Sequence, residues 1–209
     1  MSILLLNTAY FPPIQYFSKI KEHEQFCIEQ YENYGKQSYR NRCRIQFANG
    51  IMPLVVPVKK KDGQKFLTKE AQIDYSCKWQ KLHFKSIESA YKNSPFYDYY
   101  TEDLSVFFES REKYLLDLNN RILDTLLSLL SLKRTIQCTA DYITSPAGFC
   151  DYREIIHPKP SRCKAEDSNF ICRPYTQTFN DRFPFVPNLS ILDLLFNTCL
   201  LYTSDAADD

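Results

Sequence analysis

Apolar and polar residues alternate near the start of the chain in a pattern that predicts a strand, a turn, a helix and a second strand. Residues 3–7 form a short apolar run typical of a buried strand. Pro12 and Pro13 stiffen the turn that follows and suit the first positions of a helix. Apolar residues then recur at helical spacing over residues 14–23, and residues 25–29 predict the second strand. This order of elements is the opening of an α/β unit.

A hairpin is predicted next. Residues 42–48 and 53–58 have the composition of strands. Asn49 and Gly50 lie between them and form a dipeptide typical of hairpin turns. Pro53, at the start of the second strand, favours a looser connection.

The second half of the chain is predicted to be largely helical, with a long irregular region. Helical spacing of apolar residues extends over residues 79–92, 96–109 and 113–130. Short strands are predicted at 71–75 and 135–139, and short helices at 175–179 and 190–196, the last with Ser190 as its N-cap. Residues 141–173 lack periodicity, and long irregular segments in compact domains are often functional. We therefore predict a single α/β domain over residues 1–198, with a mixed sheet and flanking helices.

Composition excludes several classes of function. The 209 residues carry 26 Lys and Arg against 25 Asp and Glu, which gives no reason to expect binding to nucleic acid or to a membrane surface. No apolar run is long enough for a membrane span, and no signal peptide is recognised. With only four glycines, the chain has neither a glycine-rich phosphate loop nor a G-x-S-x-G nucleophile elbow. The cysteines are scattered without a usual zinc spacing, so we expect reduced thiols, a cytoplasmic location and no metal site. The sequence leaves the cofactor unknown.

The last eleven residues have an unusual sequence. Residues 199–209, CLLYTSDAADD, match one translated frame of a transposon adapter used in sequencing libraries. We interpret them as a non-native tail that replaces the natural C-terminus, and we exclude them from the fold prediction.

A dense polar cluster precedes the predicted hairpin. Its members with binding chemistry are Lys36, Tyr39, Arg40, Asn41 and Arg42. Arginine can bind carboxylate or phosphate through two parallel N–H groups, and lysine adds a point charge. We predict that this cluster binds an anionic substrate, with Lys59, Lys60, Lys61 and Lys69 nearby; the alternative is a solvated face with one structural arginine.

Four further residues are candidates for a site. Tyr10 follows the first strand, and ligands of open α/β sheets bind beyond the carboxyl ends of strands. His83, on a predicted helix, and His157, in the irregular region, are the candidate general bases, although His83 also suits a packed position. Asp193 lies among leucines and is expected to need a partner such as Arg40 or Arg42. We place Asp193 with the substrate-binding residues, although structural pairing is the simpler interpretation.

Three segments together resemble the WbqC-like protein family. They are residues 8–17 (TAYFPPIQYF), 39–42 (YRNR) and 188–197 (NLSILDLLFN), and residues 54–58 (LVVPV) and 79–83 (WQKLH) also fit. The resemblance covers about residues 3–198. The chain departs from the family where many members carry a Gln-Pro pair before the aromatic-proline turn, so no role of that Gln carries over.

The resemblance implies a role in assembling surface polysaccharide of the O-antigen type. Members of the family occur in gene clusters for such polymers, and some are described as glycine transferases. We therefore expect a transferase that moves a group, such as a glycyl or other aminoacyl group, from an anionic activated donor to a sugar or lipid-linked acceptor. The alternative is a non-catalytic partner of a polysaccharide enzyme, which an exposed aromatic patch around Tyr97, Tyr99 and Tyr100 would favour. RNA binding would rest only on Lys and Arg interleaved with Tyr, and we do not predict a nucleic-acid partner.

Overall fold

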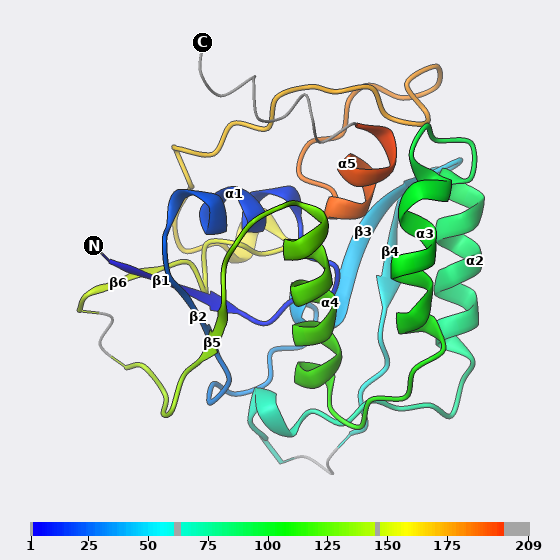
Figure 1. The fold of residues 1–209 in the computed structure, drawn as a ribbon. Helices are drawn as coiled ribbons and strands as arrows, with labels where there is room; N and C mark the ends of the chain where they lie inside the picture. The colour runs from blue at the N-terminus through cyan, green and yellow to red at the C-terminus, as the bar shows by residue number, and fades with distance from the viewer. Residues whose placement is uncertain (1, 61–63, 145–146, 199–209) are drawn as a thin grey trace.

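A four-stranded parallel sheet forms one half of the molecule (Figure 1). The computed structural model describes residues 2–60, 64–144 and 147–198. The strand order is β5-β2-β1-β6, with Leu4 of β1 paired to Phe26 of β2 and to Cys150 of β6. Both faces of the sheet are covered, because the central residues of β1 and all of β2 are buried. The strands are β1 (Ile3–Asn7), β2 (Phe26–Glu29), β5 (Ile136–Cys138) and β6 (Phe149–Asp151).

An antiparallel hairpin forms a second sheet. It consists of β3 (Arg42–Phe47) and β4 (Gly50–Val55), and Phe47 pairs directly with Gly50. The connection is therefore a tight two-residue turn, and the looser connection expected from Pro53 is wrong. Pro53 lies within β4 opposite Arg44, a position that proline tolerates in an edge strand.

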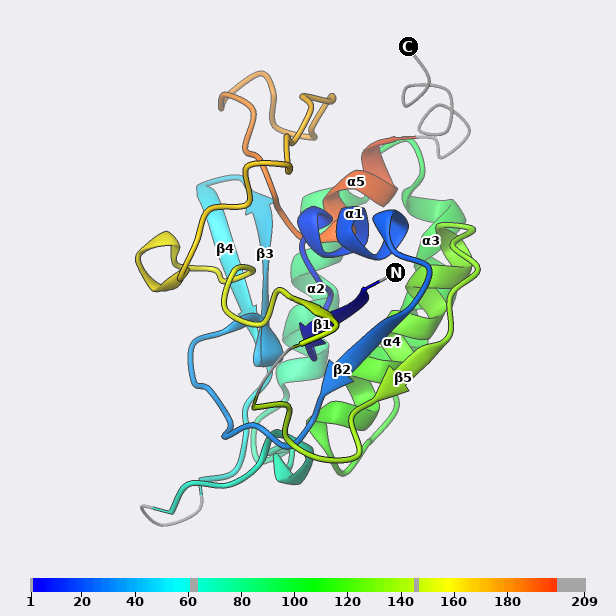
Figure 2. The ribbon, with the colours of Figure 1, turned by 90° about the vertical axis from the view of Figure 1, so that its left-hand side faces the viewer.

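Helices pack around both sheets. They are α1 (Ile14–Glu22), α2 (Trp79–Tyr91), α3 (Tyr97–Ser105), α4 (Leu115–Leu129) and α5 (Ile191–Asn197). Figures 1 and 2 place α5 next to α1 and to α3, and α2 beside strand β3 of the hairpin. One hydrophobic core includes residues from all of these helices and from both sheets, which confirms the predicted single-domain α/β class. Among the described residues, no helix has the length and apolar character needed to cross a membrane.

Three local predictions fail. The segment predicted as a strand at 71–75 makes only isolated bridges, Val58 with Ile73 and Gln72 with Tyr114. Residues 175–179 are not helical, because side chains there form tertiary hydrogen bonds instead. The irregular region contains an unpredicted strand, β6, which is too short to show a pattern of its own. The predicted adapter-derived tail lies outside the described residues.

Three segments distant in sequence meet at the end of β1. The Tyr10 N–H donates to the Tyr39 carbonyl at 2.9 Å. The Ser190 hydroxyl donates to the Phe11 carbonyl at 2.9 Å, and the Ser190 N–H to the Arg44 carbonyl at 2.9 Å. Phe11 is fully buried with φ at +39°, a backbone conformation that costs about 1–3 kcal/mol and persists only where surrounding contacts hold it. These are the segments that carry the family resemblance, and their contacts hold together the core rather than an open cleft.

Candidate anion-binding site

A cavity of about 580 Å³ lies where the loop after β2 meets the segments on either side of residues 61–63 and the 3-10 turn η4 (Pro160–Arg162). We call it the cationic cavity. Its lining consists of Tyr34, Gly35, Lys36, Val58, Lys59, Lys60, Gln64, Lys65, Phe66 and Arg162. The volume falls in the usual range for sites of small-molecule ligands.

The charge of this lining has one sign. Lys36, Lys59, Lys60, Lys65 and Arg162 contribute positive charge, and no Asp or Glu belongs to the described lining. Within the described parts of the chain, none of these five side chains forms an ion pair. Like charges gathered in a cavity raise the local concentration of anions. The cavity is therefore suited to an anionic ligand.

The structure brings two of the predicted lysines to Lys36. Lys59 and Lys60 line the same cavity, as expected from the pairing of β3 with β4. Lys69 does not line it, and its ammonium lies 3.7 Å from the centre of the Tyr31 ring. Lys61 is outside the described residues. Sequence reasoning missed Arg162, whose only signal was its place in the long irregular region.

Arg40 lies behind the cavity wall. Its Nε and Nη2 donate to the Glu32 carboxylate at 2.7 and 2.6 Å. Its Nη1 would be 3.1 Å from a Cβ on Gly35, so the glycine lets the loop backbone lie against the guanidinium. The Arg40 side chain therefore forms an internal ion pair, and it does not belong to the described lining of the cavity.

The other members of the predicted cluster are structural neighbours of the cavity. Asn41 Nδ2 donates to the Val56 carbonyl at 2.9 Å, which connects the loop to the end of the hairpin. Arg42 is half-buried; burial lowers its pKa, and the nearby Tyr34 opposes that shift. Burial raises the pKa of Tyr39 to about 12. Of the five predicted binding residues in this cluster, Lys36 alone belongs to the described lining.

Tyr10 and His83 form a buried pair. The Tyr10 hydroxyl lies 3.0 Å from His83 Nδ1, and the Trp79 ring packs edge-on to the imidazole at 5.1 Å. Burial lowers the pKa of His83 to about 4 and raises that of Tyr10. Neither residue lines the cationic cavity. Their geometry is that of a packed aromatic cluster with one internal hydrogen bond.

His157 does not belong to the described lining of the cavity either, but the charge of Arg162, a lining residue, acts on it. Its Nδ1 is 3.0 Å from the Lys159 N–H and 3.2 Å from the Lys159 carbonyl oxygen. Burial lowers the pKa of His157, and the charges of Arg162, Arg40 and Lys159 lower it further, against the effect of the backbone hydrogen bond. A lowered pKa leaves the imidazole neutral at pH 7, as a proton acceptor must be.

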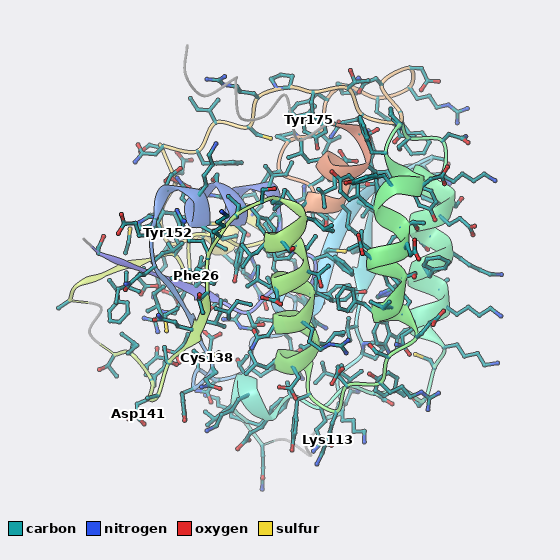
Figure 3. The ribbon with its side chains drawn as sticks, viewed as in Figure 1. Phe26, Lys113, Cys138, Asp141, Tyr152 and Tyr175 are labelled. Atoms are coloured by element: carbon teal, nitrogen blue, oxygen red, sulfur yellow. The ribbon has the colours of Figure 1, made fainter. Side chains whose placement is uncertain are left out.

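Asp193 has a different partner set from the one predicted. Its carboxylate accepts hydrogen bonds from Tyr91 at 2.9 Å, Tyr175 at 2.6 Å and Gln177 at 2.9 Å. The expectation of an Arg40 or Arg42 partner is wrong, because three neutral donors satisfy the buried carboxylate instead. Burial raises the pKa of Asp193, and these three hydrogen bonds oppose the rise. Tyr175 lies beside α5 (Figure 3), so this network connects the C-terminal loop to that helix.

Two other kinds of site, an aromatic patch on α3 and a metal site, find less support in the described residues. Tyr97 and Tyr100 are buried and only Tyr99 is exposed, at 73%, so the tyrosines of α3 do not make an aromatic patch. Within the described ranges, no group of three or more His, Cys, Asp or Glu side chains is arranged to hold a metal ion.

The chain is a single α/β domain with a cavity lined by five cationic side chains. Comparison with known proteins then identifies its family. The sequence profile of the WbqC-like protein family matches residues 8–151, and the chain belongs to that family. It is also 26% identical over 218 residues to the uncharacterized protein Rv1507c of Mycobacterium tuberculosis (strain ATCC 25618 / H37Rv), with 93% of each chain covered. No solved structure matches.

Proposed function

We propose that this protein is a group-transfer enzyme that binds an anionic activated donor in the cationic cavity. The observation that carries the proposal is the set of five cations around one cavity, without a carboxylate among its described lining. Phosphate and carboxylate groups on the donor would form charge-assisted hydrogen bonds with these side chains.

The family membership supports a proposal about the biological setting. Its members occur beside genes for surface polysaccharide, so we propose a sugar or lipid-linked acceptor and a glycyl or other aminoacyl group as cargo. A cytoplasmic location fits the cysteines of the described residues, which are all free thiols.

The chemical step requires one base. A hydroxyl or amino group of the acceptor attacks the activated carbonyl carbon of the donor, and the bond to the phosphate leaving group breaks with its electron pair. The proton of the acceptor passes to His157. This role requires the tautomer in which Nδ1–H donates to the Lys159 carbonyl, because the tautomer in which Nδ1 accepts from the Lys159 N–H carries its proton on Nε2. The five cavity cations stabilise the departing phosphate charge.

Binding and charge reversal together test the proposal. Thermal unfolding of the full chain would be measured with nucleotides, nucleotide sugars, amino acids and polyphosphates, because a ligand of the folded state raises the midpoint. For the anions that raise it, Lys59→Glu with Lys65→Glu should lower affinity at least about tenfold, since each lost charge-assisted hydrogen bond is worth about 1.5–3 kcal/mol.

The matched control reverses two exposed lysines of α2. Lys81→Glu with Lys85→Glu makes the same change in net charge away from the cavity and should leave affinity unchanged. Equal losses of ligand affinity in both double variants would show only that the net charge of the protein attracts the anion over a long range. No midpoint shift with any anion, for a folded protein, would contradict the proposal.

A further inference from the structure

Two aromatic rings line the same cavity as the cations. Tyr34 and Phe66 stack with ring centres 5.2 Å apart and an interplanar angle of 13°. Both rings are partly exposed, and both belong to the lining of the cationic cavity. The cavity therefore combines a flat apolar surface with positive charge.

Backbone pairing holds these rings in place. The Tyr34 N–H donates to the Phe66 carbonyl at 2.9 Å, and the Thr68 N–H donates to the Glu32 carbonyl at 2.9 Å. Glu32 is also the partner of Arg40, whose guanidinium supports Gly35 at the wall. The stacked pair is thus built into the fold, and binding to it would require little ordering of the loop.

A cavity with both a flat aromatic surface and positive charge should bind some anions more tightly than others. Inorganic pyrophosphate and sugar phosphates would use the lysines but offer no planar group to the rings. An aromatic amino acid would cover the rings, but its ammonium group would be repelled by the cations. A molecule with a planar aromatic group and two phosphates uses both features, and aromatic side chains stack on any nucleobase because every base has a π-face.

We propose that the cationic cavity binds the nucleoside diphosphate portion of the donor, with its base against the Tyr34–Phe66 pair and its phosphates among the lysines. This inference rests on the proposed function and names the chemical class of its donor. Tyr34 provides the test, because its ring and its hydroxyl can be removed separately.

Isothermal titration of the full chain with ADP, UDP and inorganic pyrophosphate separates the contributions. Both nucleotides should bind about tenfold or more tightly than pyrophosphate, as expected for one stacked base. Tyr34→Leu should reduce nucleotide affinity to the pyrophosphate level and leave pyrophosphate binding unchanged, whereas Tyr34→Phe should retain the preference. Tyr31→Leu is the matched control, because Tyr31 lies outside the cavity lining.

The outcomes distinguish this inference from the function on which it rests. Pyrophosphate binding as tight as nucleotide binding would overturn the inference and leave an anion-binding cavity. Equal weakening of all three ligands by Tyr34→Leu, in a variant with a normal unfolding transition, would also overturn it. Absence of binding by all three ligands would overturn the inference and count against the proposed function.

Discussion

Arg40 and Glu32 form a buried ion pair directly behind the loop that lines the cationic cavity. Their contacts are 2.6 and 2.7 Å, and the two side chains are only 10% and 13% exposed. Because a buried charge that loses its partner is strongly destabilising, this pair determines how Arg40 can be tested. Arg40→Ala would impair folding before it reported on ligand binding.

Removal of the Glu32 charge should destabilise the fold. Glu32→Gln should lower the free energy of unfolding by about 3 kcal/mol, because it leaves the Arg40 guanidinium buried without a counter-charge. Denaturant unfolding measures the loss. Glu112→Gln removes the partner of Arg121, which is 49% exposed, and should lower it by less than about 1 kcal/mol. Equal losses in the two variants would show that burial does not govern the strength of the Arg40 pair.

His83 should make stability depend on pH. Its pKa is about 4 in the folded protein, against about 6.5 for an unperturbed histidine. Between these values the unfolded chain binds more protons, so stability decreases as pH falls from about 6.5 to 4, by up to about 3 kcal/mol. As the pH falls through this range, the unfolding free energy of the wild type should decrease relative to that of His83→Leu. Parallel pH curves for the two proteins would contradict the assignment.

Replacing Asp193 with asparagine, which has the same shape, should lower the stability of the protein. Asp193→Asn places an NH₂ group where the carboxylate accepts from Tyr175 and Gln177, and Gln177 is itself fixed by two hydrogen bonds to Val186. The unfolding free energy should fall by about 1–3 kcal/mol, because a buried donor then faces another donor. Tyr175→Phe removes one donor only and should have a smaller effect. An unchanged unfolding free energy in Asp193→Asn would show that the hydrogen-bond network rearranges.

Lys19 should hold the irregular region against α1. Its ammonium is fully buried, 3.2 Å from Asp167, whose side chain is 4% exposed, and 3.0 Å from Glu22. Lys19→Met should therefore destabilise the protein by about 3 kcal/mol and increase amide exchange around Asp167. Lys21→Met, at an exposed position of the same helix, is the control and should do neither. Unchanged exchange around Asp167 would contradict this role.

The pattern of neighbouring apolar and polar residues was sufficient to predict the helices. It was not sufficient to predict several short elements. The stripe of α4 and the Ser190 cap of α5 are properties of neighbouring residues, and both appear as predicted. β6 has three residues and exists because Phe149–Asp151 pairs with β1, a contact that no local pattern contains. Residues 175–179 fail as a helix for the same reason, since Tyr175 and Gln177 bond to Asp193.

By itself, the sequence determined the α/β class, the family, and the region of the chain in which positive charge gathers. The tertiary structure decided which charges share a cavity. Lys36 lies in the lining with Arg162, whereas Arg40 is turned towards Glu32. Glu32 is only eight residues from Arg40, but the spacing of residues along the chain does not show that the loop folds so that these two charges meet.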